Sequence, residues 1–402
     1  MASELIVCKG RVIGARCVDV LSGSPFVVYA RQTILATGGG SGLFGTVSGD
    51  DRNTGDGLIL AYDAGAQLAN LEFSEFTLIY RVKGRILKLG GLAPFLSRGA
   101  VLVNRLRERF MERYFSPEEL KRAVRSQILQ AAIRETTANR APIFLDCTPV
   151  SAEAWDEFER TQGALMLNKI REVGCDYKKE LIEVLPAAHT ILAGVVIDAN
   201  CQTAVDGLWA AGECATGIHG AARLSGNGLA ACTVFGRRAG ENAAKTAIAS
   251  RSDPWLGFGG KDSEMPVKSH YLPPDEVKKI RGRITAIAAR ALGVIRNKSD
   301  LSAAKVEFSK ILDQLRDRAV GTLDSNLIEL KNLATLGLLM ADAALRRNES
   351  RGLHFRSDAA NSDQSWIKWL VATKDSIHDT PTWTHYDEMS ETKTDTQRSV
   401  QN

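Results

Sequence analysis

The sequence predicts an α/β fold, in which a doubly wound domain of the nucleotide-binding type carries an inserted α+β domain and a helical bundle follows. Three observations predict it. Short apolar strands lead into glycine-rich loops and helices on both sides of the insert, the pattern changes between residues 77 and 182, and strand-free amphipathic helices fill 274–356. The doubly wound domain is therefore expected in two parts, 1–76 and 183–249.

Composition excludes several classes of protein. A chain of 402 residues allows two or three domains at ~150 residues each. The net charge of +4 is too weak to suggest nucleic acid or a membrane surface as a partner, and no apolar run approaches ~18 residues. The seven cysteines are scattered and never spaced as CxxC, which favours reduced thiols in a cytoplasmic protein and no metal site.

The first part begins with three β-rich segments at 5–8, 11–20 and 25–30, and turn residues between them predict a meander. A short apolar strand at 32–37 follows and runs into three glycines. Residues 40–45 match GxGxxG, but loop residues follow and a helix starts only after 54–57. The dinucleotide fingerprint needs a helix that opens inside the motif, so we reject it here.

The insert at 77–182 should contain two long helices. Ser116, Pro117 and Glu119 mark the start of the first, at 117–136, and the second is expected at 152–173. After the second part, residues 250–273 form a predicted linker. Three amphipathic helices are expected at 275–293, 301–318 and 327–347. The tail at 357–402 is rich in Thr, Asp, Ser and Gln and is predicted to be largely disordered.

The stretch at 207–232 is the strongest candidate site for a polar ligand. An apolar strand at 207–211 runs into Gly212 and Glu213, further glycines surround Arg223, and a helix starts near Gly228. Glycines let the backbone approach a ligand, and a helix start offers free N–H groups and a positive dipole end. Glu213 could accept hydrogen bonds from ligand hydroxyls. The alternative is a loop that only requires positive φ angles.

Several strings resemble the flavoprotein subunits of the succinate dehydrogenase and fumarate reductase superfamily, and within it the L-aspartate oxidase group. They are ILATGGGSGLF, TGDGLILAYDAGAQLANLEF, RERFMERY, PAAHTILAGVVID, GLWAAGEC, GIHGAARLSGNGLAACTVFG and NLIELKNLATLGLLMADAALRRNESRGLHF. The resemblance covers about residues 4–356, with a weak patch at 77–100. It implies that 1–76 and 183–249 form an FAD-binding domain, that 77–182 form a capping domain, and that FAD and a small dicarboxylate are the ligands.

The resemblance also implies roles for individual residues. The cofactor contacts it implies are Ala36, Thr37, Gly38, Gly39, Thr54, Gly55, Asp56, Gly212, Glu213, Asn227, Gly228 and Leu229. His189 and Arg223 match the family's carboxylate-binding pair, and Arg122 matches an arginine of the capping domain, with Arg125 as the alternative. Arginine suits this task because its guanidinium binds a carboxylate through two parallel hydrogen bonds.

Three departures from the family pattern affect these expectations. A strand–GxGxxG–helix unit for the FAD pyrophosphate is not found, so we expect FAD to bind more weakly than in the family. We also expect the chain to be a fragment, a divergent copy, or one piece of an enzyme that an N-terminal partner fragment completes. Thr77 stands where the family has a histidine, and Arg98 stands where it has a glutamate. Gly226 and Gly228 replace the serines of the oxidases, and Gly226 leans towards the succinate dehydrogenase branch.

The function implied by the resemblance is FAD-dependent oxidation of L-aspartate to iminoaspartate, a step in NAD biosynthesis. The ESRGLHF string favours this over a flavoprotein subunit of fumarate reductase or succinate dehydrogenase. A truncated, flavin-free remnant is the third alternative. The sequence gives no basis for an oligomeric state.

Overall fold

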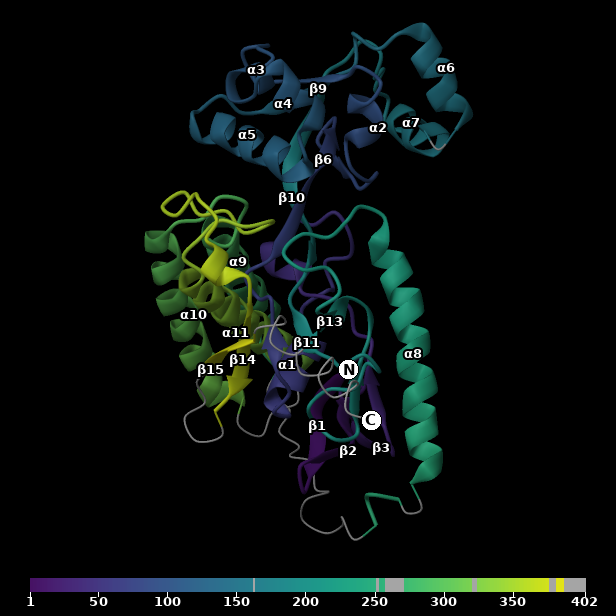
Figure 1. Cartoon of the computed structure of the whole chain (residues 1–402), viewed down its shortest axis with the longest axis vertical. Helices are drawn as coiled ribbons and strands as arrows, with labels where there is room; N and C mark the ends of the chain where they lie inside the picture. The colour runs from purple at the N-terminus through teal and green to yellow at the C-terminus, as the bar shows by residue number, and fades with distance from the viewer. Residues whose placement is uncertain (162, 251–252, 257–270, 320–323, 376–380, 387–402) are drawn as a thin grey trace, which may run out of the picture. The chain divides into compact units, whose positions relative to one another are not determined.

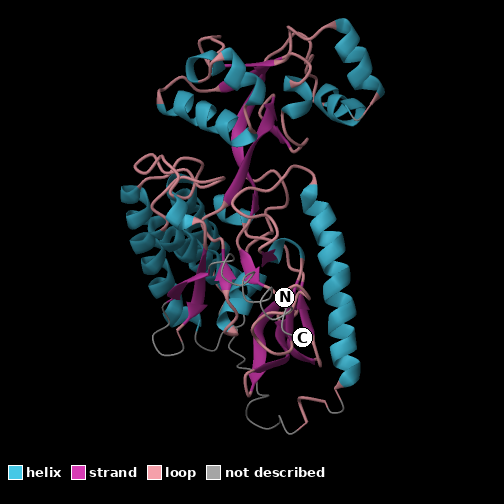
Figure 2. Ribbon diagram, in the orientation of Figure 1, coloured by secondary structure: helices cyan, strands magenta, loops and turns pink. Residues whose placement is uncertain are grey.

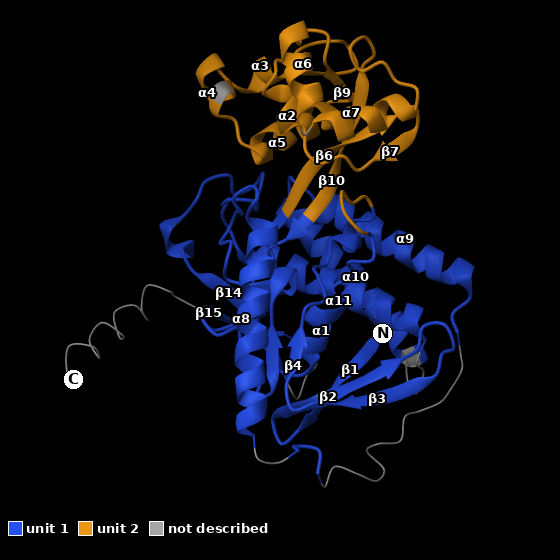
Figure 3. Cartoon of the chain, turned by 90° about the vertical axis from the view of Figure 1, so that its right-hand side faces the viewer, with its two compact units in different colours: residues 1–45, 51–74, 190–402 blue, residues 46–50, 75–189 orange. Residues whose placement is uncertain are grey.

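The computed structural model describes residues 1–161, 163–250, 253–256, 271–319, 324–375 and 381–386. They divide into two compact units (Figure 3). The first unit comprises 1–45, 51–74 and 190–402, and the second unit comprises 46–50 and 75–189. The chain passes between them around 46–50, within β6 (Ser74–Val82) after residue 74, and within β10 (Ile182–Ile191) after residue 189. The domain limits expected from the sequence, 77 and 182, stay a prediction.

The first unit opens with the predicted meander. Strands β1 (Ala2–Cys8), β2 (Arg11–Val18) and β3 (Pro25–Tyr29) form a three-stranded antiparallel sheet in that order. Strand β4 (Thr33–Leu35) then pairs in parallel with β12 (Leu208–Ala210). This pairing joins two segments that are far apart in the sequence, as a divided parallel sheet requires.

A five-stranded mixed sheet forms another layer of the first unit, in the order β13-β11-β5-β14-β15. Its strands are β13 (Ala215–Thr216), β11 (Gly194–Val196), β5 (Leu68–Ala69), β14 (Trp369–Lys374) and β15 (Pro381–Tyr386). The prediction of a largely disordered tail is therefore wrong for 357–375 and 381–386. β14 is buried at residues 370–372 because it pairs with β5, a partner that the polar composition of the tail does not reveal. Residues 387–402 lie outside the described part.

Helices flank these sheets (Figures 1 and 2). The three predicted C-terminal helices are confirmed as α9 (Pro274–Ala291), α10 (Lys298–Ala319) and α11 (Ser325–Arg346). Helix α1 (Asp56–Asp63) packs against α11, and the long α8 (Asn227–Ala249) has only Ala239 and Ala243 fully buried. Short 3-10 turns are η1 (Ser41–Phe44), η2 (Gly212–Cys214) and η4 (Gln364–Trp366). Among the described residues, no helix has the length and apolar character needed to cross a bilayer.

The second unit is built on a five-stranded sheet in the order β7-β6-β10-β9-β8. Its further strands are β7 (Arg85–Leu87), β9 (Ile143–Asp146) and β8 (Val101–Val103). Its helices are α2 (Ala93–Leu96), α3 (Met111–Tyr114), α4 (Pro117–Arg122), α5 (Arg125–Thr137), α6 (Ala152–Arg160) and α7 (Gly163–Glu172).

Both long helices expected in the second unit are interrupted. The predicted helix start at Ser116 is confirmed and forms a capping box, since Ser116 accepts from the Glu119 backbone and Glu119 accepts from Ser116. The helix nevertheless ends at Arg122, because Val124 is extended (φ −84°, ψ 160°) and α5 restarts at Arg125. The single helix expected at 152–173 is likewise divided into α6 and α7, and Thr161 at the end of α6 has non-helical dihedrals.

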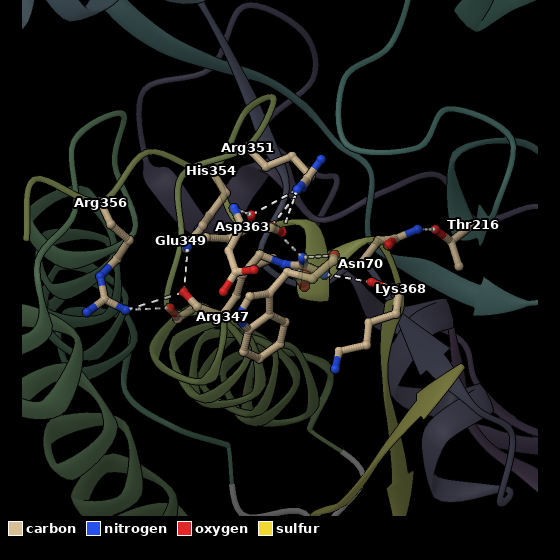
Figure 4. A network of polar contacts seen from close by, with 12 residues as sticks. Asn70, Thr216, Arg347, Glu349, Arg351, His354, Arg356, Asp363 and Lys368 are labelled. Atoms are coloured by element: carbon tan, nitrogen blue, oxygen red, sulfur yellow. Dashed lines mark hydrogen bonds and ion pairs between the residues drawn. The ribbon is translucent and has the colours of Figure 1, made fainter. Parts of the chain in front are cut away.

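A buried ionic network in the first unit joins Glu72 to the segment that follows α11 (Figure 4). The Arg347 guanidinium lies 2.5 Å from Glu72 and 3.0 Å from Glu349, and all three side chains are at most 1% exposed. The rings of Phe73 and Trp366 lie 5.1 and 5.3 Å from the Arg347 guanidinium carbon. Arg347 also donates to the Trp366 and Lys368 carbonyls. The charge is thus held by carboxylates, carbonyls and aromatic faces.

Replacing Arg347 with Met should lower the free energy of unfolding by about 3–5 kcal/mol, because Glu72 would be left buried without its counter-charge. Urea denaturation at neutral pH measures this. Arg237→Met is the control, since Arg237 is exposed on α8 and pairs with Glu241 one turn on. Equal stability of the two variants would contradict the structural role of Arg347.

A second buried carboxylate, Glu135, organises the second unit. Its side chain is fully buried and accepts from Asn104, Arg113, Tyr114 and Arg140. Burial alone would raise the pKa of Glu135, but these hydrogen bonds outweigh it and lower the pKa to about 2. A carboxylate with a lowered pKa contributes stability above its unfolded pKa and loses it as the pH falls towards the folded value.

Glu135→Gln should therefore cost about 3 kcal/mol of unfolding free energy near neutral pH, at 1.36 kcal/mol per pKa unit. The difference from the unmodified protein should shrink between about pH 4.5 and pH 2, because both proteins then carry a neutral group at this position. Chemical denaturation across this pH range tests it. A difference that stays constant down to pH 3 would show that shape, rather than charge, makes Glu135 important.

Candidate functional site

The turn after β4 brings the backbone against a carboxylate. Gly38 has φ +76°, and a Cβ built on Gly39 would lie 2.3 Å from Glu213 Oε1. Only glycine permits this approach. Gly57 is similarly constrained, because its Cβ would lie 1.8 Å from the Thr37 hydroxyl. Residues 36–39, the start of α1 and Glu213 therefore meet in one place.

Glu213 is fixed from the side of β10. The half-buried carboxylate accepts from the Thr190 hydroxyl at 2.5 Å and from the Ile191 N–H at 3.3 Å, both through Oε1. Gly212, with φ +79°, turns the chain from β12 into η2 and places Glu213 there. A carboxylate held at the edge of a glycine-lined turn suits a ligand with hydroxyl groups.

Asp56 has protein partners for both of its oxygens. Thr54 donates to Oδ2 at 2.8 Å and Asn332 on α11 donates to Oδ1 at 2.7 Å. Gly55 has φ +79° and packs against Leu336 of the same helix. Asp56 therefore joins α1 to α11 in this structure, and its predicted contact with a cofactor stays a prediction.

The start of α8 places backbone N–H groups beside a guanidinium. The Asn227 N–H and Arg223 Nη1 both donate to the Leu224 carbonyl, at 3.2 and 3.5 Å. Gly226 precedes the helix with φ +87°, and no side chain caps the first turn of Asn227, Gly228 and Leu229. Arg223 is half-buried, and its Nη1 lies 3.5 Å from the position of a Cβ on Gly228. A guanidinium beside the positive end of a helix dipole is unfavourable by itself, so this arrangement favours an anion between them.

The loop that carries Arg223 is supported at two points. Asn70 donates to the Thr216 hydroxyl at 2.8 Å (Figure 4), and Thr216 donates to the Leu192 carbonyl at 2.7 Å. Further along, Leu353 N–H donates to the Ala221 carbonyl at 3.0 Å, and a Cβ on Gly352 would lie 2.3 Å from that carbonyl oxygen. Sequence reasoning did not identify the supports from Asn70 and Leu353, because each lies more than 100 residues from its partner.

The other predicted substrate residues belong to the second unit. His189 on β10 is exposed, and its Nδ1 lies 2.8 Å from the Ser48 hydroxyl. Arg122 is exposed at the end of α4, whereas Arg125, the alternative, forms an ion pair with the buried Glu75. The ion pair holds the Arg125 guanidinium in a defined position. No such ion pair is seen for Arg122 among the described residues.

These residues fit part of FAD. The Ser41 hydroxyl is buried two residues after Gly39 and has no hydrogen-bond partner among the described residues, so a polar ligand group would satisfy it. Glu213 supplies an acceptor for hydroxyls, and the uncapped turn of α8 supplies donors for a polar ring edge. Because Gly39 has no side chain, the backbone at this turn can lie close to the Glu213 carboxylate.

The sequence matches the family described as "FAD binding domain" over residues 1–229 and "Fumarate reductase flavoprotein C-term" over residues 281–400. The chain belongs to the succinate dehydrogenase and fumarate reductase flavoprotein family. The predicted fold class, the cofactor FAD and the general activity of an FAD-dependent oxidoreductase are confirmed at this level.

The relatives of this flavoprotein are named for different activities. The fumarate reductase (CoM/CoB) subunit of Methanothermobacter marburgensis is 33% identical, covering 93% of this chain and 69% of the relative. L-Aspartate oxidase of Bacillus subtilis is 32% identical, covering 93% and 66%. A mutant E. coli quinol fumarate reductase has a TM-score of 0.80 at 25% identity, covering 96% and 70%. The chain spans about two thirds of the length of these proteins.

Gly39→Ala should reduce FAD affinity at least about 10-fold, because the new methyl would displace the Glu213 carboxylate by steric overlap. Quenching of FAD fluorescence on titration with protein measures the change. Gly236→Ala is the matched control, since a Cβ there meets nothing within 4 Å on exposed α8. Circular dichroism should show both variants folded. Unchanged FAD binding by Gly39→Ala would exclude this turn from the cofactor site.

Proposed function

We propose that this flavoprotein oxidises L-aspartate to iminoaspartate in NAD biosynthesis, with FAD as the hydride acceptor. The observation that best supports this proposal is the position of Arg223, whose half-buried guanidinium lies at the start of α8, where no side chain caps the helix. That arrangement suits the carboxylate of a small diacid. The similarity to the L-aspartate oxidase of Bacillus subtilis supports this substrate.

The chain's own residues would bind and orient the substrate. Arg223 and the α8 N–H groups would hold one carboxylate, and His189 remains the second member of the carboxylate-binding pair that the family pattern implies. Arg125, held by its ion pair with Glu75, is the better candidate for the arginine of the capping domain. In the oxidation, a hydride leaves Cα of aspartate and a proton leaves its amino group, so that the imine forms.

Fumarate reduction is the second candidate. The Methanothermobacter fumarate reductase relative is as similar to this chain as the oxidases are. Gly226, where the oxidases have serine, also leans in this direction. Such an activity would need a redox partner protein, because the relative is named as one subunit of an enzyme. For either activity we propose a cytoplasmic protein, supported by seven cysteines that are all free.

Two assays on the full chain supplied with FAD separate these candidates. Aspartate-dependent reduction of oxygen or of a dye supports the oxidase. Fumarate-dependent oxidation of a reduced viologen dye, with no turnover of aspartate, supports the reductase. Turnover of neither acid by a protein that has bound FAD would contradict both.

Arg223→Gln should lower kcat/KM for the accepted diacid on the order of 100-fold, since a charge-assisted carboxylate contact contributes roughly 1.5–3 kcal/mol. FAD affinity should change far less. Steady-state kinetics with the FAD-loaded variant tests this. Arg237→Gln, further along α8, is the control that keeps the same change of net charge. Equal loss in both variants would point to general electrostatics and against a carboxylate contact by Arg223.

A further inference from the structure

Residues 217–226 form the loop that carries Arg223, the Arg223 loop. Three of its residues, Gly217, Gly220 and Gly226, have φ angles of +102°, +56° and +87°. Glycine adopts many backbone conformations at similar energy, so such a sequence does not by itself hold a side chain in one place. The position of Arg223 therefore depends on the contacts that the loop makes with other segments of the first unit.

The first of these contacts is with Gly352, which follows α11 in the chain. Gly352 has φ +55°, and a Cβ built on it would lie 2.3 Å from the Ala221 carbonyl oxygen and 2.8 Å from the Ala221 Cβ. The neighbouring Leu353 N–H donates to the same carbonyl at 3.0 Å. The two backbones thus lie in direct contact, which only glycine permits at this position.

The second contact is with Trp369, the first residue of β14. A Cβ built on Gly217 would lie 2.7 Å from Cη2 of the Trp369 indole and 3.4 Å from Cζ2. The indole ring therefore packs directly against the start of the Arg223 loop. A side chain on Gly217 would have to displace either the ring or the loop.

The buried ionic network fixes the backbone next to both contacts (Figure 4). Arg347 donates to the Lys368 carbonyl at 3.0 Å, directly before Trp369. Arg347 also lies 3.0 Å from Glu349, and Glu349 accepts from Arg351 at 2.7 and 3.0 Å. Arg351 directly precedes the glycine of the first contact. One network thus holds the segment at 350–369 at both of the places where it touches the Arg223 loop.

The Arg223 loop is held on both sides of the arginine. Ala221 stands two residues before Arg223, and after it Gly226 leads directly into α8. A guanidinium that binds a carboxylate through two parallel hydrogen bonds needs such a fixed position. A misplacement of about 1 Å can cost on the order of 100-fold in rate.

We propose that Gly352 and Trp369 position Arg223 for the diacid, so that the segment at 350–369 sets the affinity for the substrate. Both are positioning residues, because they act through the Arg223 loop. The inference rests on the proposed function, which assigns Arg223 to a substrate carboxylate. The FAD contacts proposed at Gly39 and Glu213 do not involve this segment, so the affinity for FAD should not follow the affinity for the diacid.

Gly352→Ala should weaken succinate binding at least about 10-fold, because the new methyl would push the Ala221 carbonyl and the loop away. FAD affinity should stay the same. Calorimetric titration of succinate into the FAD-loaded full chain measures the change. Gly10→Ala is the matched control, since Gly10 has φ +78° and a Cβ there meets nothing within 4 Å. Equal succinate affinity in the two variants, or a parallel loss of FAD, would overturn the proposal.

A second pair of variants tests the contact with Trp369. Gly217→Ala should also weaken succinate, because the methyl would overlap the indole ring. Adding Trp369→Phe to this variant removes the outer ring of the indole and should restore most of the affinity, with Trp369→Phe alone as the reference. A purely structural role of the two residues predicts additive losses. Additive losses in the double variant would therefore overturn the role of Trp369.

Tryptic cleavage after Arg223, followed by mass spectrometry, reports the freedom of the loop whether or not a diacid binds. It should be at least about 10-fold faster in Gly352→Ala than in Gly10→Ala, and equal rates would overturn the positioning. Faster cleavage with unchanged succinate affinity would overturn the role of the loop in substrate binding. If the unmodified chain binds FAD but no succinate, the proposed function fails, and the cleavage rates alone decide whether Gly352 positions Arg223.

Discussion

The contact of Arg347 with Glu72 and Glu349 is the constraint on which much of the first unit depends. Taking these three side chains out of water is costly, and the cost is offset only because each charge has close partners. Arg296 belongs to the same region, donates to the Glu72 carbonyl and lies 3.0 Å from His354 Nδ1. Burial lowers the pKa of Arg296 to about 10 and holds the pKa of His354 well below its usual value, so the arginine stays charged and the histidine neutral near neutral pH. Such a network tolerates few alternative arrangements, because any shift leaves a buried charge unpaired.

This rigidity reaches the candidate site through the backbone. The segment from Glu349 to Arg356 is held by the network, and Leu353 within it donates to the Ala221 carbonyl. Ala221 stands two residues before Arg223. An arginine on a glycine-rich loop would otherwise have a large choice of positions. Here, the segment that follows α11 contributes to the site by limiting the conformations of the loop. Asn70 adds a second restraint through Thr216.

Local patterns predicted the parts of the structure that depend on neighbouring residues. The meander, the three C-terminal helices and the helix start at Ser116 all follow from turn chemistry, periodicity or a short motif. The features that could not be predicted depend on distant partners. The polar tail forms β14 because β5 is available to pair with it, and the helix at 117–136 breaks at Val124. The supports of Arg223 and the orphan hydroxyl of Ser41 are visible only in three dimensions.

The position where this sequence departs most clearly from its family has a structural counterpart. Thr77 stands where the family pattern has histidine, and its hydroxyl opens onto an apolar cavity beside Arg125. A histidine there would fill part of this space and present a ring nitrogen that titrates near neutral pH. Threonine removes that charge and leaves room, while Arg125 and its partner Glu75 remain in place. The substitution thus replaces a titratable contact by a neutral donor next to an apolar volume. The substitution leaves the fold of the second unit intact, since β6 keeps its place in the sheet with Thr77 buried.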